Sequence, residues 1–347
     1  MRTITAIMGD GIGPEVMEAT MRVVDATGVL INWEKVYAGQ AALDKTGSPL
    51  PQETLDSITR NKVALKGPCD TPIGSGFKSV NVKMRQLFDT YFIPRLVVSM
   101  PGVKSRFSDV NLIVLREGVE DIYAGDEDGD YEKGIIHGVI TRKNSTRFFE
   151  RVFDYAKINN RKHVTIVHKA NIIKHAYGLF LRVGLEVAER YPEIKVDSKI
   201  VDDMCMKLVM NPNQFDVIAA PNMFGDIVSE LCAGLVGGLG VVSGANLGDK
   251  YAIFEAGHGT APDIAGKGIA NPTALILSAA MMLEYIGESK ACAIIVCAVN
   301  EVLFEGKYIT KDITHARNEK LRSMGYYLPV STDRMTDAIV EQVKRRL

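Results

Sequence analysis

The sequence predicts a soluble α/β protein. Short apolar segments with strand character alternate with segments of helical periodicity along most of the chain. The 347 residues are enough for one large or two ordinary domains, and the 46% apolar and 24% charged residues are typical of a globular enzyme. Neither an internal repeat nor a linker divides the chain. Two domains, if present, are therefore expected to share one continuous sheet.

The expected elements follow from these periodicities. Strands are expected at residues 3–8, 63–66, 112–115, 163–168 and 217–220, and helices at 15–27, 148–158, 172–189, 274–286 and 291–304. Pro14 stands at a position that suits the first turn of a helix. Residues 118–141 carry regularly spaced glycines between short β-prone pieces. They predict a hairpin arm that pairs with another subunit.

The overall composition excludes several classes of function. A net charge of −1 provides no basic field for nucleic acid or for an anionic membrane. The longest apolar run, residues 291–299, is too short to span a bilayer. Five cysteines without a C-x-x-C pair indicate free thiols in a reducing compartment. The first residues form a strand pattern and not a signal segment, so we expect a cytoplasmic protein.

Residues 258–272 form the most informative segment. They read H-G-T-A-P-D-I-A-G-K-G-I-A-N-P, and three glycines with two prolines exclude a regular helix or strand. The segment lies between two strongly apolar stretches and carries His258 and Asp263. An ordered loop of this kind predicts a binding site more than a spacer.

A second glycine-rich segment, G-D-G-I-G-P-E at residues 9–15, follows an expected strand and opens an expected helix. Its spacing departs from the G-x-G-x-x-G pattern of dinucleotide-binding turns, and a proline follows the third glycine. A tight strand-to-helix turn is therefore favoured over a phosphate-binding loop.

Polar residues in the middle of the chain suggest a substrate with several carboxylates. Ser79, Asn81 and Arg85 lie within two helical turns, and Arg95 and Arg116 follow at short intervals. Arginine binds carboxylates through two parallel hydrogen bonds. Spacing alone leaves open the alternative that these are ordinary surface arginines.

Other residues offer acid–base and metal chemistry. Tyr123 and Lys169 each follow a buried strand, and both are usable as general acid or base when their pKa values are tuned. Asp202 follows a strand pattern at residues 200–201, and Asp226 and Glu230 are four residues apart, so they share a helix face. Such oxygen ligands suit Mg²⁺ or Mn²⁺, although solvated carboxylates explain the pattern equally well.

Together these segments resemble the isocitrate/isopropylmalate dehydrogenase family of β-decarboxylating dehydrogenases, and within it most of all the NAD-dependent isocitrate dehydrogenases. The resemblance runs nearly end to end. It covers G-D-G-I-G-P-E, S-V-N-V-K-M-R, E-D-I-Y-A-G, V-H-K-A-N-I, N-M-F-G-D-I-V-S-E, H-G-T-A-P-D-I-A-G and the T-K-D that ends at Asp312.

The resemblance implies an α/β fold of two domains around a shared mixed sheet, which is not a Rossmann fold. One domain would comprise residues 1–90 and 237–347, and the other residues 91–236. A β clasp arm, about residues 121–141, would hold the partner in a homodimer or a higher oligomer. The Rossmann interpretation of residues 9–15 is thereby removed.

The resemblance also implies roles for single residues. Ser79, Asn81, Arg85, Arg95 and Arg116 would hold a tricarboxylate substrate. The serine and the asparagine suit the extra carboxylate of isocitrate, because an apolar pocket would leave that charge unpaired. Tyr123 would protonate the enolate after CO₂ leaves. Lys169 would help to remove the hydroxyl proton, and Asp202, Asp226 and Glu230 would bind the metal, with Lys169 and Asp202 coming from the partner subunit.

NAD is the cofactor that the resemblance implies. Thr71 and Glu255 would lie near the nicotinamide, and the remaining residues would line the adenosine side, namely His258, Gly259, Ala261, Asp263, Ile264 and Asn271. The Asp263 carboxylate can accept hydrogen bonds from a ribose diol, while its charge repels a 2′-phosphate. Relatives that use NADP tend to carry Lys and Tyr at these two positions, 263 and 264.

Three residues depart from the family pattern, and four alternatives remain. Glu230 stands where most relatives have Asp, Gly118 replaces an asparagine, and Leu96 replaces a proline. The alternatives within the same chemistry are homoisocitrate, 3-isopropylmalate and tartrate dehydrogenase. An alternative of another class is a regulatory, non-catalytic subunit of a hetero-oligomeric isocitrate dehydrogenase.

Overall fold

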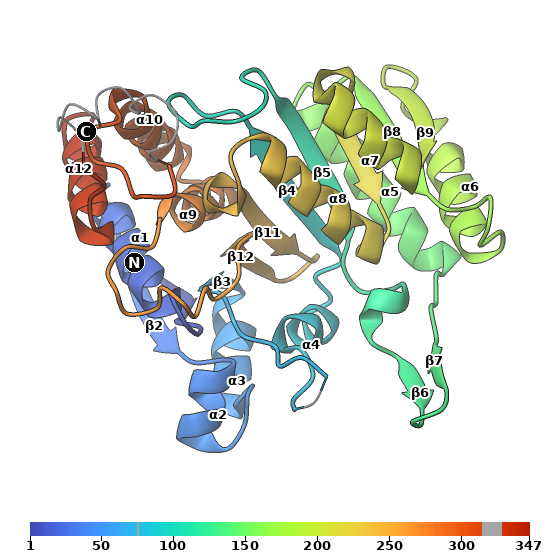
Figure 1. Cartoon of the computed structure of the whole chain (residues 1–347), viewed down its shortest axis with the longest axis horizontal. Coiled ribbons are helices and arrows are strands. Elements are labelled where there is room, and N and C mark those ends of the chain that lie inside the picture. The colour runs from blue at the N-terminus through green and yellow to red at the C-terminus, as the bar shows by residue number, and fades with distance from the viewer. Residues whose placement is uncertain (75, 314–327) are drawn as a thin grey trace.

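The computed structural model describes residues 1–74, 76–313 and 328–347, and a twisted ten-stranded sheet forms its centre (Figure 1). The strands, from one edge to the other, are β2 (Ile31–Val36), β1 (Arg2–Ile7), β3 (Val63–Lys66), β12 (Ala252–Ala256), β11 (Ser243–Leu247), β4 (Phe92–Val98), β5 (Asn111–Glu117), β10 (Val217–Ala220), β8 (His163–His168) and β9 (Lys195–Ile200). The three pairings from β12 through β11 and β4 to β5 are antiparallel, and the others are parallel. The predicted shared mixed sheet is confirmed.

Helices follow most strands, as the alternating pattern predicts. They are α1 (Gly13–Asp25), α2 (Gln40–Thr46), α3 (Gln52–Asn61), α4 (Val80–Leu87), α5 (Arg142–Ile158), α6 (Ala176–Ala188), α7 (Val201–Met210), α8 (Asn222–Leu235), α9 (Thr273–Tyr285), α10 (Ser289–Glu305) and α12 (Thr332–Lys344). The chain begins in β1 to β3, crosses to the other end of the sheet, and returns through β11 and β12. Both chain ends therefore lie in the same half (Figure 1).

This route agrees with the predicted division into residues 1–90 with 237–347 and residues 91–236. The domain boundaries themselves stay a prediction. Part of the predicted first domain, residues 314–327, lies outside the described residues.

Capping residues fix the ends of several helices. The side chains of Ser79, Thr141 and Ser331 accept hydrogen bonds from backbone N–H groups in the first turns of α4, α5 and α12. Gly47 and Gly306 end α2 and α10 in the left-handed conformation that glycine adopts without strain. Helix α9 is buried on nearly all sides, which explains its continuous apolar sequence.

The two faces of the sheet are covered differently. On one face, here called the helix-covered face, residues such as Ile4, Leu115 and Phe254 belong to one large apolar cluster with α1, α5, α6, α9 and α10. On the other face, two separate clusters form, one with α3 and α4 and one with α7 and α8. Between those two clusters the central strands carry polar side chains. We call this the cleft face.

The predicted arm forms a two-stranded hairpin that projects from the body (Figure 1). Its strands are β6 (Glu127–Gly129) and β7 (Gly134–Ile136), and both lie within the predicted 121–141. A 3₁₀ turn, η1 (Ile122–Ala124), precedes it. The pairing of this hairpin with a second copy of the chain stays a prediction.

Some predicted boundaries were wrong. Helix α5 starts at Arg142 and not at 148, because Thr141 caps it. Helix α6 starts at Ala176 and not at 172. Strand β9 ends at Ile200, so Val201 begins α7 and Asp202 lies in a first helical turn. Within residues 1–74, 76–313 and 328–347, no helix has the length and apolar content needed to cross a membrane.

Candidate active site

A cavity of about 470 Å³ opens on the cleft face, between α4 and α8 and above the central strands. Most of the residues predicted for substrate, catalysis, metal and nicotinamide line it, together with two of those predicted for the adenosine side: Thr71, Ser79, Asn81, Arg85, Arg95, Arg116, Tyr123, Asp226, Glu230, Glu255, His258 and Gly259. The sheet brings them together from segments far apart in sequence. The alternative of ordinary surface arginines is wrong for all three, since each is buried.

The three arginines reach the cavity from three elements. Arg85 lies in the last turn of α4, Arg95 at the middle of β4 and Arg116 near the end of β5. Two glycines leave room for them. A Cβ at Gly244 would lie 1.8 Å from the Arg95 Nη1 atom, and a Cβ at Gly225 would lie 2.6 Å from the Arg116 Cγ atom.

Several buried polar atoms in this cavity have no partner among the described residues. They are the Asn81 Oδ1, Arg85 Nε, Arg95 Nη1 and His258 Nε2 atoms. A buried polar atom without a hydrogen bond is costly. The two arginine N–H groups are donors and fit an anionic ligand, whereas the Asn81 oxygen and the Nε2 atom of a neutral His258 are acceptors and fit a ligand that also carries a donor such as a hydroxyl. Burial and the nearby Arg116 charge lower the pKa of Arg85 to about 10, which still leaves it cationic at neutral pH.

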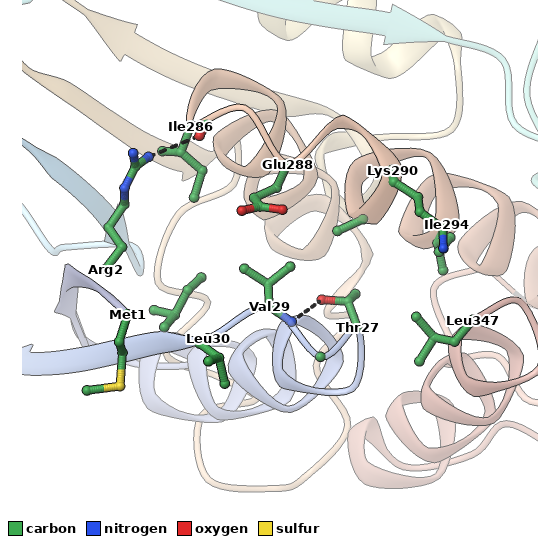
Figure 2. Close-up of a pocket in the computed structure, with 13 residues that line it drawn as sticks. Met1, Arg2, Thr27, Val29, Leu30, Ile286, Glu288, Lys290, Ile294 and Leu347 are labelled. Carbon is green, nitrogen blue, oxygen red and sulfur yellow. Dashed lines mark hydrogen bonds between the residues drawn. The ribbon is translucent and has the colours of Figure 1, made fainter.

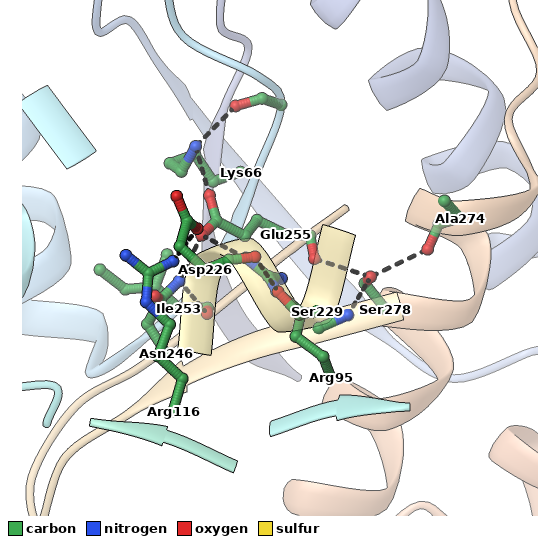
Figure 3. Close-up of polar contacts among 12 residues, drawn as sticks. Lys66, Arg95, Arg116, Asp226, Ser229, Asn246, Ile253, Glu255, Ala274 and Ser278 are labelled. Atoms are coloured by element: carbon green, nitrogen blue, oxygen red, sulfur yellow. Dashed lines mark hydrogen bonds and ion pairs between the residues drawn. The ribbon is translucent and has the colours of Figure 1, made fainter. Parts of the chain in front are cut away.

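The floor of the cavity holds a buried ion-pair network (Figure 3). The Lys66 Nζ atom lies 2.7 Å from a Glu255 carboxylate oxygen, and both side chains are almost fully buried. The Asn246 amide donates to the same carboxylate at 2.6 Å, and Arg95 approaches it at 3.6 Å. Burial alone would raise the pKa of Glu255, but the charges of Lys66 and Arg95 outweigh it and hold the pKa well below its usual range.

Helix α9 supports this network from behind. The Ser278 hydroxyl accepts a hydrogen bond from the backbone N–H of Gly244 at 3.2 Å and lies 2.9 Å from the backbone oxygen of Glu255 (Figure 3). The helix is thereby attached to both β11 and β12 at the level of the ion pair.

Tyr123, Asp226 and Glu230 lie at one wall of the cavity. Asp226 forms an ion pair with Arg116, whose guanidinium also donates to the Asn222 side chain at 2.8 and 3.0 Å. Burial raises the pKa of Tyr123, and the neighbouring Asp226 carboxylate raises it further. The phenol is therefore protonated at neutral pH and has a proton to donate, although the raised pKa makes it a weaker acid than an ordinary tyrosine.

The predicted metal ligands are only partly together in one chain. Asp226 and Glu230 lie one turn apart on α8 and face the same cavity, which fits a hard cation such as Mg²⁺ or Mn²⁺. Asp202 is elsewhere: it is largely exposed on α7 and forms an ion pair with Lys169. Over the described part of the chain, no three His, Cys, Asp or Glu residues gather as a ligand set.

The predicted adenosine residues continue along the irregular loop 258–272, as expected from its composition. Ala261, Asp263, Ile264 and Asn271 do not line the cavity. Asp263 is exposed, and the Asn271 side chain donates to Asp312 at 2.9 Å. Burial lowers the pKa of His258, which favours its neutral form at the junction of loop and cavity.

Sequence reasoning missed Lys66 and Asn246. Lys66 ends the otherwise apolar strand β3, and its charge in a fully buried segment was an available signal. Asn246 had no such signal, because its role depends on β11 lying beside β12.

Two residues that depart from the family pattern fit this structure. Glu230 lines the active-site cavity, and Gly118 lies where a larger residue would not fit. A Cβ at Gly118 would lie 2.6 Å from the Thr90 backbone oxygen, so this chain has no room there for the usual asparagine.

Two other cavities contain none of the predicted site residues. One, of about 620 Å³, lies between the start of β1 and the turn before α10, with Arg2, Glu288 and Lys290 among its lining (Figure 2). The other, of about 660 Å³, lies on the helix-covered face behind the ion pair and is lined mostly by apolar side chains. Neither is lined by more than one arginine, so the chemistry points to the cleft face.

Comparison with known proteins agrees with this geometry. The model of the family described as isocitrate/isopropylmalate dehydrogenase matches residues 3–339. A crystal structure of isocitrate dehydrogenase from Methylococcus capsulatus superposes with a TM-score of 0.94 at 48% identity, covering 99% of this chain and 100% of that one.

Two curated relatives have contrasting names. A mitochondrial protein of Dictyostelium discoideum, named as a regulatory subunit of isocitrate dehydrogenase (NAD), is 48% identical over 90% of this chain and 87% of its own length. A mitochondrial protein of Arabidopsis thaliana, named as a catalytic subunit of isocitrate dehydrogenase (NAD), is 47% identical over 90% of this chain and 84% of its own length.

Proposed function

This chain belongs to the isocitrate/isopropylmalate dehydrogenase family, and from that premise we propose that it oxidises isocitrate with NAD and a divalent metal, releasing CO₂ and 2-oxoglutarate. The observation that carries the proposal is the buried cluster of Arg85, Arg95 and Arg116, with polar atoms that lack protein partners among the described residues. Buried arginines attract carboxylates strongly, because charge-assisted hydrogen bonds gain strength away from water.

Ser79 and Asn81 support isocitrate over 3-isopropylmalate. Both line the cavity at the start of α4, near Arg85. A hydroxyl and an amide can hydrogen-bond a third carboxylate, whereas an isopropyl group would leave them unpaired. Ser79 also caps α4, so the position has a structural role as well.

The geometry supports the acid–base roles. Tyr123 lies beside Arg116, with 4.8 Å between the guanidinium carbon and the ring centroid, and its phenol carries the proton that an enolate carbon would receive. Lys169 and Asp202 lie outside the cavity of their own chain, so we propose that they serve the cavity of a second copy. There Lys169 would help to remove the substrate hydroxyl proton.

Asp226 and Glu230, with Asp202 of a second copy, would hold Mg²⁺ or Mn²⁺. When bound, such a cation stabilises negative charge on the substrate oxygens. Thr71 and Glu255 would flank the nicotinamide, which takes up the hydride, and His258 and Gly259 would begin the adenosine side. Asp263 is exposed on the adjoining loop, where its charge would disfavour the 2′-phosphate of NADP.

A homodimer is the oligomer that we propose. Helices α7 and α8 expose Met206, Met210 and Ile227, of which Met210 is 70% exposed. The projecting hairpin region adds Ile136 and Val139. A second copy would cover this apolar surface and bring in Lys169 and Asp202. Sedimentation velocity is expected to show a dimer or a higher oligomer, and a monomer that is fully active would contradict this proposal.

A panel of 2-hydroxy acids tests the substrate. With NAD⁺ and Mn²⁺, we expect kcat/KM to be highest for isocitrate among isocitrate, homoisocitrate, 3-isopropylmalate and tartrate. The highest value for 3-isopropylmalate would show that the interpretation of Ser79 and Asn81 is wrong.

The cofactor is tested by a double substitution. Asp263→Lys with Ile264→Tyr removes the repelling carboxylate and adds a cation, so we expect the ratio of kcat/KM for NAD to that for NADP to fall by roughly tenfold or more. An unchanged ratio in a folded variant would contradict the assignment of Asp263.

The 48% identity to a protein named as a regulatory subunit supports a second candidate, a non-catalytic role for this chain. The cavity retains Tyr123 and Asp226, and the chain retains Lys169 and Asp202, which argues for catalysis. Expression of this chain alone decides: NADH formation from isocitrate supports the enzyme, and its absence in a folded protein that binds isocitrate supports the regulatory role. The cytoplasmic location stays a prediction, and both curated relatives have mitochondrial names.

A further inference from the structure

The glycine-rich segment at residues 9–15 has no role in the chemistry above, and none of its residues lines the active-site cavity. Its contacts show where it acts. Asp10 is 7% exposed, and its carboxylate accepts the backbone N–H of Asp70 at 2.8 Å. The Asp10 N–H donates to the Pro68 oxygen at 2.7 Å. The segment therefore holds residues 68–70, which lead directly to Thr71.

The same carboxylate anchors the start of α2. It accepts the backbone N–H groups of Gln40 at 3.0 Å and Ala41 at 2.7 Å. Gly39 permits this approach, because a Cβ there would lie 1.9 Å from the Asp10 Oδ2 atom. All three partners of the Asp10 carboxylate are donors, so an amide in its place would oppose at least one of them.

The other contacts of the segment are to the loop 258–272. Gly11 has a φ of 57°, and a Cβ on it would lie 2.1 Å from the Thr260 oxygen. The Ile12 N–H donates to that oxygen at 2.9 Å. Only glycine allows the two backbones to approach this closely.

Glu15 holds the far end of the same loop. Its Oε1 atom accepts the backbone N–H of Ala270 at 2.9 Å, and the Thr332 hydroxyl contacts the same carboxylate. Thr260 and Ala270 are thus both fixed by residues 9–15. Asp263, to which we assign the choice of NAD, lies between these two anchors.

We propose that residues 9–15 form a clamp that positions both walls of the NAD site, with Asp10 and Glu15 as its positioning residues. The inference rests on the proposed function, because it concerns the loops to which NAD binding is assigned. Asp10 fixes the wall at Thr71, and Glu15 with Gly11 fixes the adenosine loop. The substrate residues on α4, β4 and β5 are held by other contacts.

The test separates cofactor binding from substrate binding in the full-length protein. Glu15→Ala removes the acceptor for the Ala270 N–H, whereas Glu15→Gln keeps an amide oxygen in its place. Glu18→Ala is the matched control, since Glu18 lies on the same helix and pairs with Lys35 at 2.6 Å on the surface. Asp10→Asn tests the other wall independently. The readouts are the Kd for NADH by fluorescence, the KM for isocitrate, kcat and Tm.

We expect Glu15→Ala and Asp10→Asn each to raise the Kd for NADH roughly tenfold, as the loss of a hydrogen bond to a carboxylate implies. The KM for isocitrate is expected to stay within about twofold, and Glu15→Gln and Glu18→Ala to bind NADH like wild type. If the substitutions instead loosened the whole fold, the binding of NADH and of isocitrate would weaken together, and this result would overturn the clamp.

If one variant does not fold, the other still tests the clamp at its own wall, Asp10→Asn at Thr71 and Glu15→Ala at the adenosine loop. A wild-type protein that binds NADH and oxidises isocitrate, together with a folded variant that binds NADH equally well, contradicts the clamp alone. A wild-type protein that binds no NADH contradicts the proposed function and the clamp with it.

Discussion

The two faces of the strands β4, β11 and β12 carry opposite chemistry although they share a backbone. On the cleft face, Arg95, Asn246 and Glu255 form a buried polar network with Lys66. On the helix-covered face, the residues next to them in sequence, Leu96, Leu247 and Phe254, border an apolar cavity of about 660 Å³ beneath α9 and α10. Because side chains alternate along a strand, one register fixes both environments.

The comparison extends to the two buried acids next to these strands. Glu255 faces the cleft with two cations beside it, and its pKa is held low. Glu117, at the end of β5, lies on the helix-covered side against Asn144 of α5 and has only N–H donors as partners among the described residues. Burial raises the pKa of Glu117 to about 7, although the backbone hydrogen bonds that its carboxylate accepts act to lower this pKa. The cations, and not burial, distinguish the two sites.

The largest expected effect comes from breaking the ion pair on the cleft face. Glu255→Gln leaves Lys66 buried without its counter-charge, so we expect the free energy of unfolding to fall by about 3–5 kcal/mol. Urea unfolding measures this loss. The double variant Lys66→Met with Glu255→Gln removes both charges, and we expect it to recover part of the stability but not the activity. Equal stability of wild type and Glu255→Gln would mean that the pair contributes nothing.

The second effect is a pH dependence that differs between the two acids. The folded pKa of Glu117, about 7, lies above the unfolded value, so its contribution to stability is present below about pH 4.5 and is lost as pH rises through 7. The loss is on the order of 3 kcal/mol. Between pH 4.5 and 7, we expect the free energy of unfolding of Glu117→Gln to change less with pH than that of the wild type.

The depressed pKa of Glu255 has the opposite sign. Its contribution is present above the unfolded pKa of about 4.5 and is lost as pH falls from there through the folded value. Unfolding titrations of wild type, Glu117→Gln and Glu255→Gln across pH 3 to 8 separate the two. If the free energy of unfolding had the same pH dependence in all three proteins, the proposed difference between Glu117 and Glu255 would be wrong.

A smaller effect is expected from the helix-covered face. Leu277 on α9 is 7% exposed and borders the apolar cavity. Leu277→Ala is expected to lower the free energy of unfolding by about 2 kcal/mol, the low end for such changes, because the side chain already faces open space. The KM for isocitrate is expected to stay unchanged. A clear rise in this KM would show that the two faces are coupled.

The sequence alone predicts the α/β class, five of the ten strands of the large sheet and five of the helices, and the family resemblance adds the residues on the substrate wall. These carry local signals: apolar periodicity, a proline at a first helical turn and polar residues at strand ends. It does not predict that Lys66 and Glu255 form a pair, because the two residues lie in segments far apart along the chain. Only the pairing of β3 with β12, in which Lys66 and Glu255 share a register position, brings them together.

The separation of Asp226 from Asp202 has a similar origin. Both were predicted as ligands of one metal, and the fold places Asp202 with Lys169 on a different surface of the same chain. A single sequence gives no register between two copies of a chain. The prediction of a shared site therefore depends on the family resemblance and on the exposed apolar surface of α7 and α8.

The smallest effect is expected from a change of shape without a change of polarity. Met281 on α9 borders the apolar cavity, and Met281→Leu keeps nearly the same volume, so we expect a loss of less than about 1.5 kcal/mol and unchanged kinetics. Lys66→Met is the counterpart on the cleft face, since it also exchanges side chains of similar size but removes a charge. We expect this variant to lose most of its kcat/KM for isocitrate. If Lys66→Met changed stability and kcat/KM as little as Met281→Leu, the shape of the side chain at position 66, and not its charge, would determine the activity.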